Sequence, residues 1–318
     1  MKFYGIVPSL LLVIGAAVAP HLAQAQAPAK DAKPKEFAAG KPLGAVNEAG
    51  QFTTMTPNVK VYGSFRFAES CTYDATRNLI VVMNAGVPQT MQENDGYVSL
   101  LNPDGSVHTA KWIGATRDGL TLNHPLGSAI QNGVLYTADI DHVRTFDLAT
   151  GRPGRAYPVA GSTFLNGIAV TKDGTIFVSN TRPPECLFKI TPSGEVSTVV
   201  SGKPLALPNG VAIDQDGNVV VVNVGDNAVM TFDVDGKLLQ TEHAVEGGND
   251  GIVVTKDGTK YVSSVKFGSV SRIRPGKPAE IIAAGIPSAA SMGYDSKQNQ
   301  LIIPMNPNDA VAFIKLDE

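Results

Sequence analysis

The sequence has few of the residues that mark several common kinds of functional site. Its 318 residues include only two cysteines, and neither a CxxC pair nor a Cys/His cluster with zinc-ligand spacing is present. A net charge of −3 provides no basic surface for nucleic acid and no polybasic patch for a membrane. A G-x-S-x-G nucleophile elbow and a P-loop are also missing. These absences disfavour zinc, nucleotide, nucleic-acid and serine-triad chemistry.

The two cysteines, Cys71 and Cys186, fall near or within apolar strand-like runs in different parts of the chain. An oxidising compartment would permit a disulfide between them. We nevertheless expect two buried free thiols, because cysteine behaves as a small apolar residue in such runs.

Long hydrophobic runs are scarce as well, and the one near the amino terminus is short. Lys2 precedes an apolar stretch at residues 6–19, and residues 23–25 fit a small-x-small cleavage site. This pattern predicts a secretory signal peptide at residues 1–25, followed by a flexible leader at residues 26–57. We expect a periplasmic or secreted protein with no membrane span after cleavage, the alternative being an uncleaved anchor.

Glycine, by contrast, is abundant, and it marks an internal repeat. Phrases such as N-G-V-A-I-D-Q-D-G and D-G-I-V-V-T-K-D-G recur about every 40 residues, with one longer interval after the first copy. The six copies begin at Glu69, Leu126, Asn166, Asn209, Asp250 and Met292. A fixed period of this length indicates one supersecondary unit repeated along the chain.

Each repeat predicts four β-strands. An apolar strand leads to a polar turn that is often Asp-Gly, and a strand rich in β-branched residues follows, with a third and a more variable fourth strand behind it. The fold class is therefore all-β, a six-bladed β-propeller of four-stranded blades at residues 58–318. The last copy has room for only three strands, so we predict that the N-terminal strand within residues 58–67 completes the last blade and closes the ring. The longer first interval predicts an insertion at residues 86–96.

The residue before the central glycine changes from copy to copy, and the fold gives that position a meaning. The innermost strand of every propeller blade borders the central channel, so the six residues would form one ring. They are called the ring residues below: Glu69, Leu126, Asn166, Asn209, Asp250 and Met292. Four of them carry side-chain oxygens, and Leu126 and Met292 make an apolar sector.

Two carboxylates brought close together repel each other unless they are protonated or bridged by a cation. With two amide oxygens and no sulfur or imidazole, they form a hard-ligand set that suits Ca²⁺, although another divalent cation is possible. We therefore predict a metal site of Glu69, Asn166, Asn209 and Asp250. The simpler interpretation is that Asn-Gly and Asp-Gly are ordinary turn dipeptides.

A second set of polar residues lies about fourteen positions after the ring residues, where a hairpin returns to the same face. We predict that these residues hydrogen-bond the metal ligands or line the mouth of a substrate pocket, with ordinary strand-end turns as the alternative. They are Asn84, Asp139, Asn180, Asn223, Ser264 and Asn306.

These motifs resemble the regucalcin–gluconolactonase superfamily of six-bladed, calcium-dependent propellers, which includes diisopropyl fluorophosphatase and paraoxonase relatives. The resemblance covers residues 58–318 and rests on A-E-x-x-x-Y-D at residues 68–74, L-P-N-G-V-A-I-D-x-D-G at residues 207–217 and N-D-G-I at residues 249–252. It implies that calcium is bound by Glu69, Asn166, Asn209 and Asp250. It also implies that Asp250 is the general base or nucleophile.

The chain departs from this superfamily at two places. Sugar-lactonase members carry an arginine just before the blade-three ligand, whereas residues 162–165 are S-T-F-L. Paraoxonase-like members have a histidine where Leu126 stands, and we expect His124, two residues earlier, to face elsewhere. Both departures disfavour a charged sugar-acid substrate and a histidine-assisted mechanism.

The function predicted from these observations is calcium-dependent hydrolysis of a small-molecule lactone or related ester, with Asp250 as base or nucleophile. The alternative is a non-catalytic propeller that binds a ligand or a protein and uses calcium, if at all, to hold its blades. A propeller of the NHL type, which needs no metal, belongs to the same alternative. The sequence contains no feature that identifies the substrate or the oligomeric state.

Overall fold

The computed structural model describes residues 47, 51, 53–63, 65–86, 94–114 and 119–317. All described residues belong to one compact unit within Glu36–Glu318. The predicted signal peptide, most of the predicted leader and the centre of the predicted insertion lie outside the described residues. Within the described ranges, no helix has the length and apolar character needed to cross a membrane.

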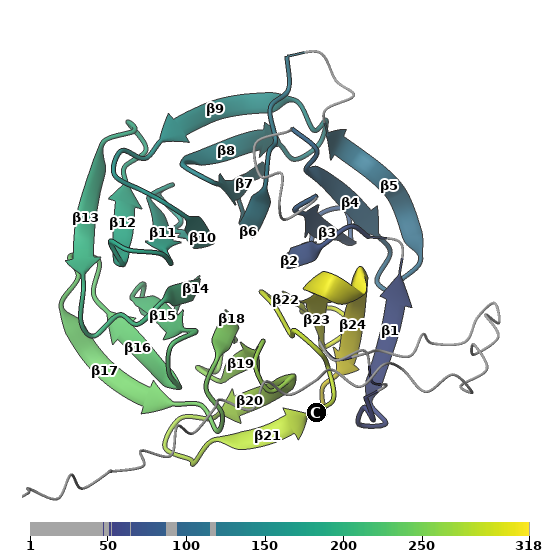
Figure 1. Cartoon of the computed structure of the whole chain (residues 1–318). Coiled ribbons are helices and arrows are strands. Elements are labelled where there is room, and N and C mark those ends of the chain that lie inside the picture. Colours follow the sequence, from purple (N-terminus) through teal and green to yellow (C-terminus); the bar gives the residue numbers. More distant parts are fainter. Residues whose placement is uncertain are drawn as a thin grey trace, which may run out of the picture. The chain divides into compact units, whose positions relative to one another are not determined.

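The described residues form six four-stranded antiparallel sheets arranged as the blades of a ring (Figure 1). Blade one contains β2 (Ala68–Asp74), β3 (Leu79–Asn84), β4 (Tyr97–Leu101) and β5 (Val107–Gly114). Blade two contains β6 (Pro125–Gln131), β7 (Val134–Asp139), β8 (His142–Asp147) and β9 (Pro153–Pro158). Blade three contains β10 (Leu165–Val170), β11 (Ile176–Asn180), β12 (Cys186–Ile190) and β13 (Val196–Ser201). Blade four contains β14 (Pro208–Ile213), β15 (Val219–Asn223), β16 (Ala228–Phe232) and β17 (Leu238–His243). Blade five contains β18 (Asn249–Val254), β19 (Lys260–Ser264), β20 (Ser269–Ile273) and β21 (Glu280–Ala283). Blade six contains β22 (Gly293–Asp295), β23 (Gln300–Met305), β24 (Ala310–Lys315) and β1 (Val59–Gly63), with the 3₁₀ helix η1 (Asn306–Asn308) between β23 and β24. The predicted six-bladed propeller is confirmed.

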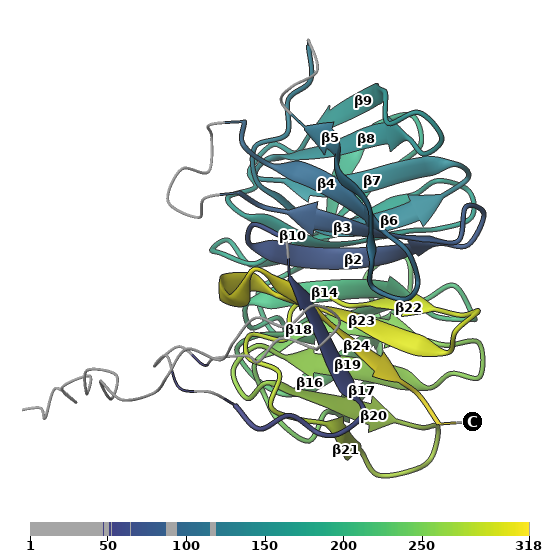
Figure 2. The same ribbon diagram turned by 90° about the vertical axis from the view of Figure 1, so that its right-hand side faces the viewer.

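The ring is closed by the N-terminal strand, as predicted. Strand β1 is the outer strand of blade six and pairs antiparallel with β24, from Val59 opposite Ile314 to Gly63 opposite Ala310 (Figures 1 and 2). Val59 and Val61 are buried against the core of that blade, while Lys60 between them is exposed. This alternation is what a strand with one buried face requires.

The apolar core lies between neighbouring blades. Phe177 and Leu187 of blade three, for example, pack in one cluster with Val221 and Met230 of blade four. Because each blade buries its faces against its neighbours, no blade has a complete core of its own. Cys71 and Cys186 are both buried and free, which confirms the prediction made for them.

The innermost strands have an irregularity at the ring position in five blades. The pairing register shifts between Ala68 and Ser70 in β2, and between Leu165 and Ile168 in β10. Strands β6, β14 and β18 show the same shift around their own ring residues. A bulge of this kind leaves a residue out of the ladder and re-aims its side chain. The Asn-Gly and Asp-Gly pairs therefore lie in bulges inside strands and not in turns.

The glycines after the ring residues have a packing role. A Cβ atom at Gly127, Gly167 or Gly210 would meet the backbone of the next blade's ring residue at less than 3.0 Å. The innermost strands thus approach one another so closely that only glycine fits. In blade one, Ser70 holds this place, and its hydroxyl donates a hydrogen bond of 2.6 Å to the carbonyl of Leu126 in blade two.

Candidate metal centre

A cavity of about 200 Å³, called the central cavity below, lies where the innermost strands converge. It is lined by Phe67, Glu69, His124, Leu126, Phe164, Asn166, Arg182, Asn209, Asp250 and Asn306. Five of the six ring residues are in this list. The sixth, Met292, is not, and it packs instead in the core cluster of the closing blade with Val61 and Met305. The apolar sector of the cavity therefore contains Leu126 without Met292.

The two acids of the cavity come from blades one and five, which are separated in the ring by blade six (Figure 1). Glu69 on β2 is 4% exposed and Asp250 on β18 is 5% exposed. Each receives a hydrogen bond from an asparagine amide. Asn306 Nδ2 donates to Glu69 Oε2, and Asn209 Nδ2 donates to Asp250 Oδ2 over 3.0 Å. The structure thus gathers both acids and two of the amides at one place.

Burial makes the charged form of both acids costly. It raises the pKa of Glu69 well above its usual range, and the negative charge of Asp250 raises it further, against the hydrogen bond from Asn306. Burial also raises the pKa of Asp250 to about 7, opposed by the hydrogen bond from Asn209. Two carboxylates that cannot both ionise without help are the electrostatic signature of a site that a cation would neutralise.

Four oxygens of the cavity are buried without a hydrogen-bond donor in the described part of the chain. They are Asn166 Oδ1, Asn209 Oδ1, Asp250 Oδ1 and Asn306 Oδ1. A buried oxygen without a partner costs free energy, so four of them in one cavity need an explanation. Carboxylate and amide oxygens are the ligands that Ca²⁺ prefers. The residues present therefore fit a divalent cation of that class.

This donor set is also the wrong kind for zinc. Among the described residues, no group of three or more His, Cys, Asp or Glu side chains is close enough to hold an ion. Any metal at this place must take amide oxygens together with the two acids, which favours a hard cation with irregular coordination. Asn306 belongs to the second set of polar residues predicted from the sequence, called the supporting set below. Its Nδ2 donates a hydrogen bond to Glu69, and its Oδ1 has no donor among the described residues.

The other residues of the supporting set hold the loops that lead into the innermost strands. Asn84 accepts from the backbone N–H of Arg66, and Asn180 accepts from those of Thr163 and Phe164. Ser264 donates to the carbonyl of the loop before β18, and Asn223 donates to that of the loop before β14. None of these side chains lines the central cavity. They shape its rim through the backbone.

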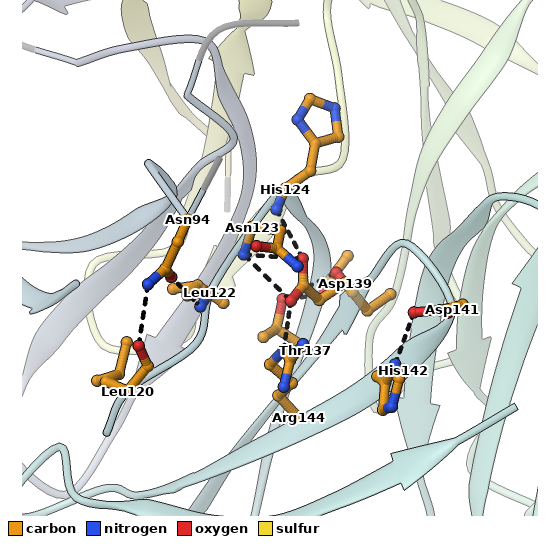
Figure 3. A network of polar contacts seen from close by, with 12 residues as sticks. Asn94, Leu120, Leu122, Asn123, His124, Thr137, Asp139, Asp141, His142 and Arg144 are labelled. Carbon is orange, nitrogen blue, oxygen red and sulfur yellow. Dashed lines mark hydrogen bonds and ion pairs between the residues drawn. The ribbon is translucent and has the colours of Figure 1, made fainter. Parts of the chain in front are cut away.

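Asp139 holds the corresponding loop of blade two. It accepts hydrogen bonds from the backbone N–H groups of Asn123 at 3.1 Å and His124 at 2.6 Å, and it pairs with Arg144 (Figure 3). The His124 ring is turned away from Asp139 in this view, and it lines the central cavity. The expectation that His124 faces elsewhere is therefore wrong. Asp139 ends the adjacent strand β7, opposite Pro125, and its bonds to the backbone of residues 123 and 124 hold the loop on this path.

Four cavity residues were not indicated by the repeat pattern: Phe67, His124, Phe164 and Arg182. His124 Nδ1 lies 2.8 Å from the carbonyl of Ala85, so this nitrogen carries the proton and Nε2 keeps a lone pair. Burial lowers the pKa of His124, which favours the neutral ring. Arg182, in the loop after β11, stacks its guanidinium over Phe164 at 4.0 Å from the ring centroid. Loop residues lie outside the repeated phrase, so their position in the sequence gave no signal.

The comparisons with known proteins agree with this fold. The family model for the SMP-30/gluconolactonase/LRE-like region matches residues 50–298. A gluconolactonase structure from Xanthomonas campestris is similar with a TM-score of 0.61 and 19% identity, covering 82% of this chain and 91% of that one. Virginiamycin B lyase from Staphylococcus aureus is similar with a TM-score of 0.56 and 12% identity, covering 83% and 100%. At such identities the two structures show a shared fold.

One curated relative is similar in sequence. Actin-interacting protein 1 of Caenorhabditis elegans is 24% identical over 225 residues, which cover 66% of this chain and 35% of the relative. The chain therefore spans about a third of the length of that protein.

Proposed function

Because this chain belongs to the SMP-30/gluconolactonase/LRE-like family, we propose that it is a calcium-dependent hydrolase of a lactone or related ester. The observation that carries the proposal is the group of four buried oxygens without donors, beside two buried acids in one cavity. Glu69, Asn166, Asn209 and Asp250 would hold the ion, and Asn306 Oδ1 is a fifth possible ligand. Another divalent cation of similar size would satisfy the same oxygens.

The chemistry needed is acyl transfer to water. A bound divalent cation polarises the substrate carbonyl and stabilises the negative charge that develops on its oxygen. The acyl carbon–oxygen bond breaks, water supplies the new oxygen, and the products are a carboxylate and an alcohol. The chain's own residues must orient the substrate, accept a proton from water or attack the acyl carbon, and return a proton to the leaving oxygen.

Asp250 is the residue we assign to attack or proton acceptance. Asn209 holds its Oδ2, while Oδ1 has no donor within the described residues. A carboxylate fixed by one oxygen presents the other in a defined direction, as a nucleophile or a base requires. His124 offers a neutral Nε2 on the same cavity and would handle the second proton. Leu126, Phe67 and Phe164 supply an apolar wall for the substrate.

A second function has an observation in its favour. Both acids are about 95% buried, and the cavity is smaller than the roughly 300–1,000 Å³ typical of small-molecule pockets. An ion enclosed in this way would have a structural role alone: it would hold the blades together in a non-catalytic propeller that binds a ligand or a protein. The stability and the turnover of the protein distinguish the two functions.

We place this function in the periplasm or outside the cell, on the strength of the predicted signal peptide. Calcium is abundant outside the cytosol, and extracellular modules bind it with dissociation constants of about 10⁻⁴–10⁻³ M. A site with two acids and amide oxygens would be sufficient there.

The proposal is tested by calcium titration of chelator-treated protein and by a turnover screen with lactones, aryl esters and phosphotriesters. We expect calcium binding, and hydrolysis that falls at least about 100-fold in Asp250→Asn, because removal of an essential nucleophile or base costs that much or more. Asp216→Asn, which makes the same chemical change at an exposed turn of blade four, is the control and should behave as wild type. Wild-type turnover by Asp250→Asn would remove Asp250 from the chemistry. Calcium-dependent stability without hydrolysis of any compound would favour the non-catalytic function.

A further inference from the structure

Arg182 occupies an unusual position for a cation. It lines the same cavity as Glu69 and Asp250, yet it takes part in none of the ion pairs between described residues. Its backbone carbonyl accepts hydrogen bonds, but within the described ranges its guanidinium donates none. Five N–H donors are therefore available at the rim of the cavity.

The guanidinium is held in place by a contact that leaves its N–H donors free. It stacks on Phe164, with 4.0 Å between the guanidinium carbon and the ring centroid. Asn180 joins the two segments that carry this pair, since its amide donates to the Arg182 carbonyl over 2.8 Å and its oxygen accepts from the Phe164 N–H over 2.8 Å. Thr163 Oγ1 donates to the Arg182 carbonyl as well, over 3.0 Å. A stacked guanidinium keeps its in-plane donors free, which suits two parallel bonds to a carboxylate.

The charge of the cavity points to the same ligand. The divalent cation of the proposed function would balance the two acids, and burial lowers the pKa of His124, which favours its neutral form. Arg182 then remains as the uncompensated charge among the lining residues that the structure describes. A single positive charge matches one carboxylate better than it matches a phosphate dianion.

We propose that Arg182 binds a carboxylate on the substrate, so that the cavity selects small lactones or esters that carry an acidic group next to an apolar ring or chain. Phe67, Phe164 and Leu126 contact the apolar part, and Arg182 fixes its charged end. The inference that the ligand is a substrate rests on the proposed hydrolase function. Binding of a carboxylate by Arg182 does not require turnover. The arginine missing from residues 162–165 is thus replaced by one from the loop after β11, which stacks on Phe164 of that very segment.

The test separates binding from turnover. The binding probes are 3-oxocyclopentanecarboxylate and 3-oxocyclopentanecarboxamide, ring ketones of matched shape that cannot be hydrolysed. Calorimetry with calcium-loaded protein should show the carboxylate binding about tenfold to hundredfold more tightly, the usual effect of a charge-assisted hydrogen bond. In Arg182→Met, which keeps the length of the stem, this preference should disappear. Melting temperature and calcium affinity, measured on the same sample, should stay at wild-type values and so show that the loop is folded.

Arg155→Met is the matched control, because Arg155 also stacks on an aromatic ring, at 4.5 Å over Tyr157, but lies on the outer strand β9. It should keep the full preference for the carboxylate. Equal binding of the two ketones to wild-type protein, undetectable binding of both at millimolar concentration, or an unchanged preference in Arg182→Met would each overturn the proposal.

Turnover of the two corresponding γ-butyrolactones, one with a carboxylate and one with a carboxamide, separates this proposal from the hydrolase function. If both lactones are hydrolysed equally and both ketones bind equally, the hydrolase function stands and the role of Arg182 falls. If neither is hydrolysed but Arg182→Met abolishes a clear preference for the carboxylate ketone, the carboxylate site stands and the hydrolase function falls.

Discussion

At the scale of single residues, the central cavity follows one simple rule twice. Each buried acid receives an amide N–H from an asparagine, Glu69 from Asn306 and Asp250 from Asn209, and each asparagine keeps a bare oxygen. One amide thus restrains an acid and leaves an oxygen that would be a neutral ligand for the proposed ion. An aspartate in its place would lose the donor, and a glutamine would carry its amide one methylene farther from the backbone, so asparagine is the residue that fits.

A pH dependence follows from the raised pKa values of the two acids. In metal-free protein the folded state binds protons at these carboxyls more tightly than the unfolded chain, where such pKa values are about 4. The free energy of unfolding contributed by the pair therefore falls as pH rises from about 4 to about 7, where Asp250 loses its proton. The proposed calcium ion would neutralise the resulting charge, so the gain in melting temperature on adding calcium should be larger at pH 8 than at pH 5.

Scanning calorimetry across this pH range, with and without calcium, measures the effect. The double variant Glu69→Gln/Asp250→Asn should lose the pH dependence that the two acids give to the free energy of unfolding, and also the response to calcium. Subtracting the variant's free energy of unfolding from that of wild type at each pH cancels the contribution of all other titratable groups. A wild-type excess of metal-free stability that grows from pH 5 to pH 8 would contradict this electrostatic account.

At the scale of elements, the bulged innermost strand is the device that builds the site. The bulge turns one side chain out of each ladder, and the glycine after it lets the neighbouring strand approach. The repeated phrase allowed the ring position to be predicted, because this device is identical from blade to blade. It did not reveal the bulge, since Asn-Gly is equally typical of a turn when only the sequence is known.

We expect Gly167→Ala to damage both packing and the metal site. Its Cβ would press on the backbone carbonyl of Asn209, and backbone cannot move aside as a side chain can. The substitution should cost about 1–3 kcal/mol of stability, as overpacking usually does, and should weaken calcium binding at least tenfold by separating Asn166 from Asn209. Denaturant unfolding and calcium titration measure the two effects.

Gly217→Ala is the matched control for this prediction. Gly217 has a positive φ of 86° but open space around a Cβ atom, so the variant should lose about 1–2 kcal/mol by backbone strain alone. Its calcium affinity should stay at the wild-type value. If both variants bind calcium as tightly as wild type, close approach of the strands does not position the ligands.

At the scale of the whole molecule, the six sheets depend on one closing contact. The six-copy pattern predicted the ring and its closure, since the last copy lacked a strand and the N-terminal segment could supply it. The loops were not predictable in the same way. The repeat indicated the positions of Asp139 and Asn180, which hold loop backbone. Arg182 lies in a loop outside the repeated phrase, so its place in the cavity depends on the course of that one loop.

The closing contact can be weakened without touching the site. Val61→Asp would place an unpaired charge where a 1% exposed valine now packs between β1 and the blade-six core, so we expect a loss of about 3 kcal/mol or more. The adjacent Lys60→Asp, on the exposed face of the same strand, should change stability by less than about 0.5 kcal/mol. Chemical denaturation of both variants measures the difference. Equal stability of the two would show that β1 contributes little to the closed ring.

The pairing of β1 with β24 also sets an order of events in the making of the protein. Translation produces Val59 long before its partner Ile314, so blade six stays incomplete until β24 has been made. Joining such distant segments lowers the entropy of the chain before any stabilising contact forms, which delays assembly of the final ring. The ring therefore stays open while blades one to five are made, and an open chain can be threaded across a bilayer, as the proposed export would require.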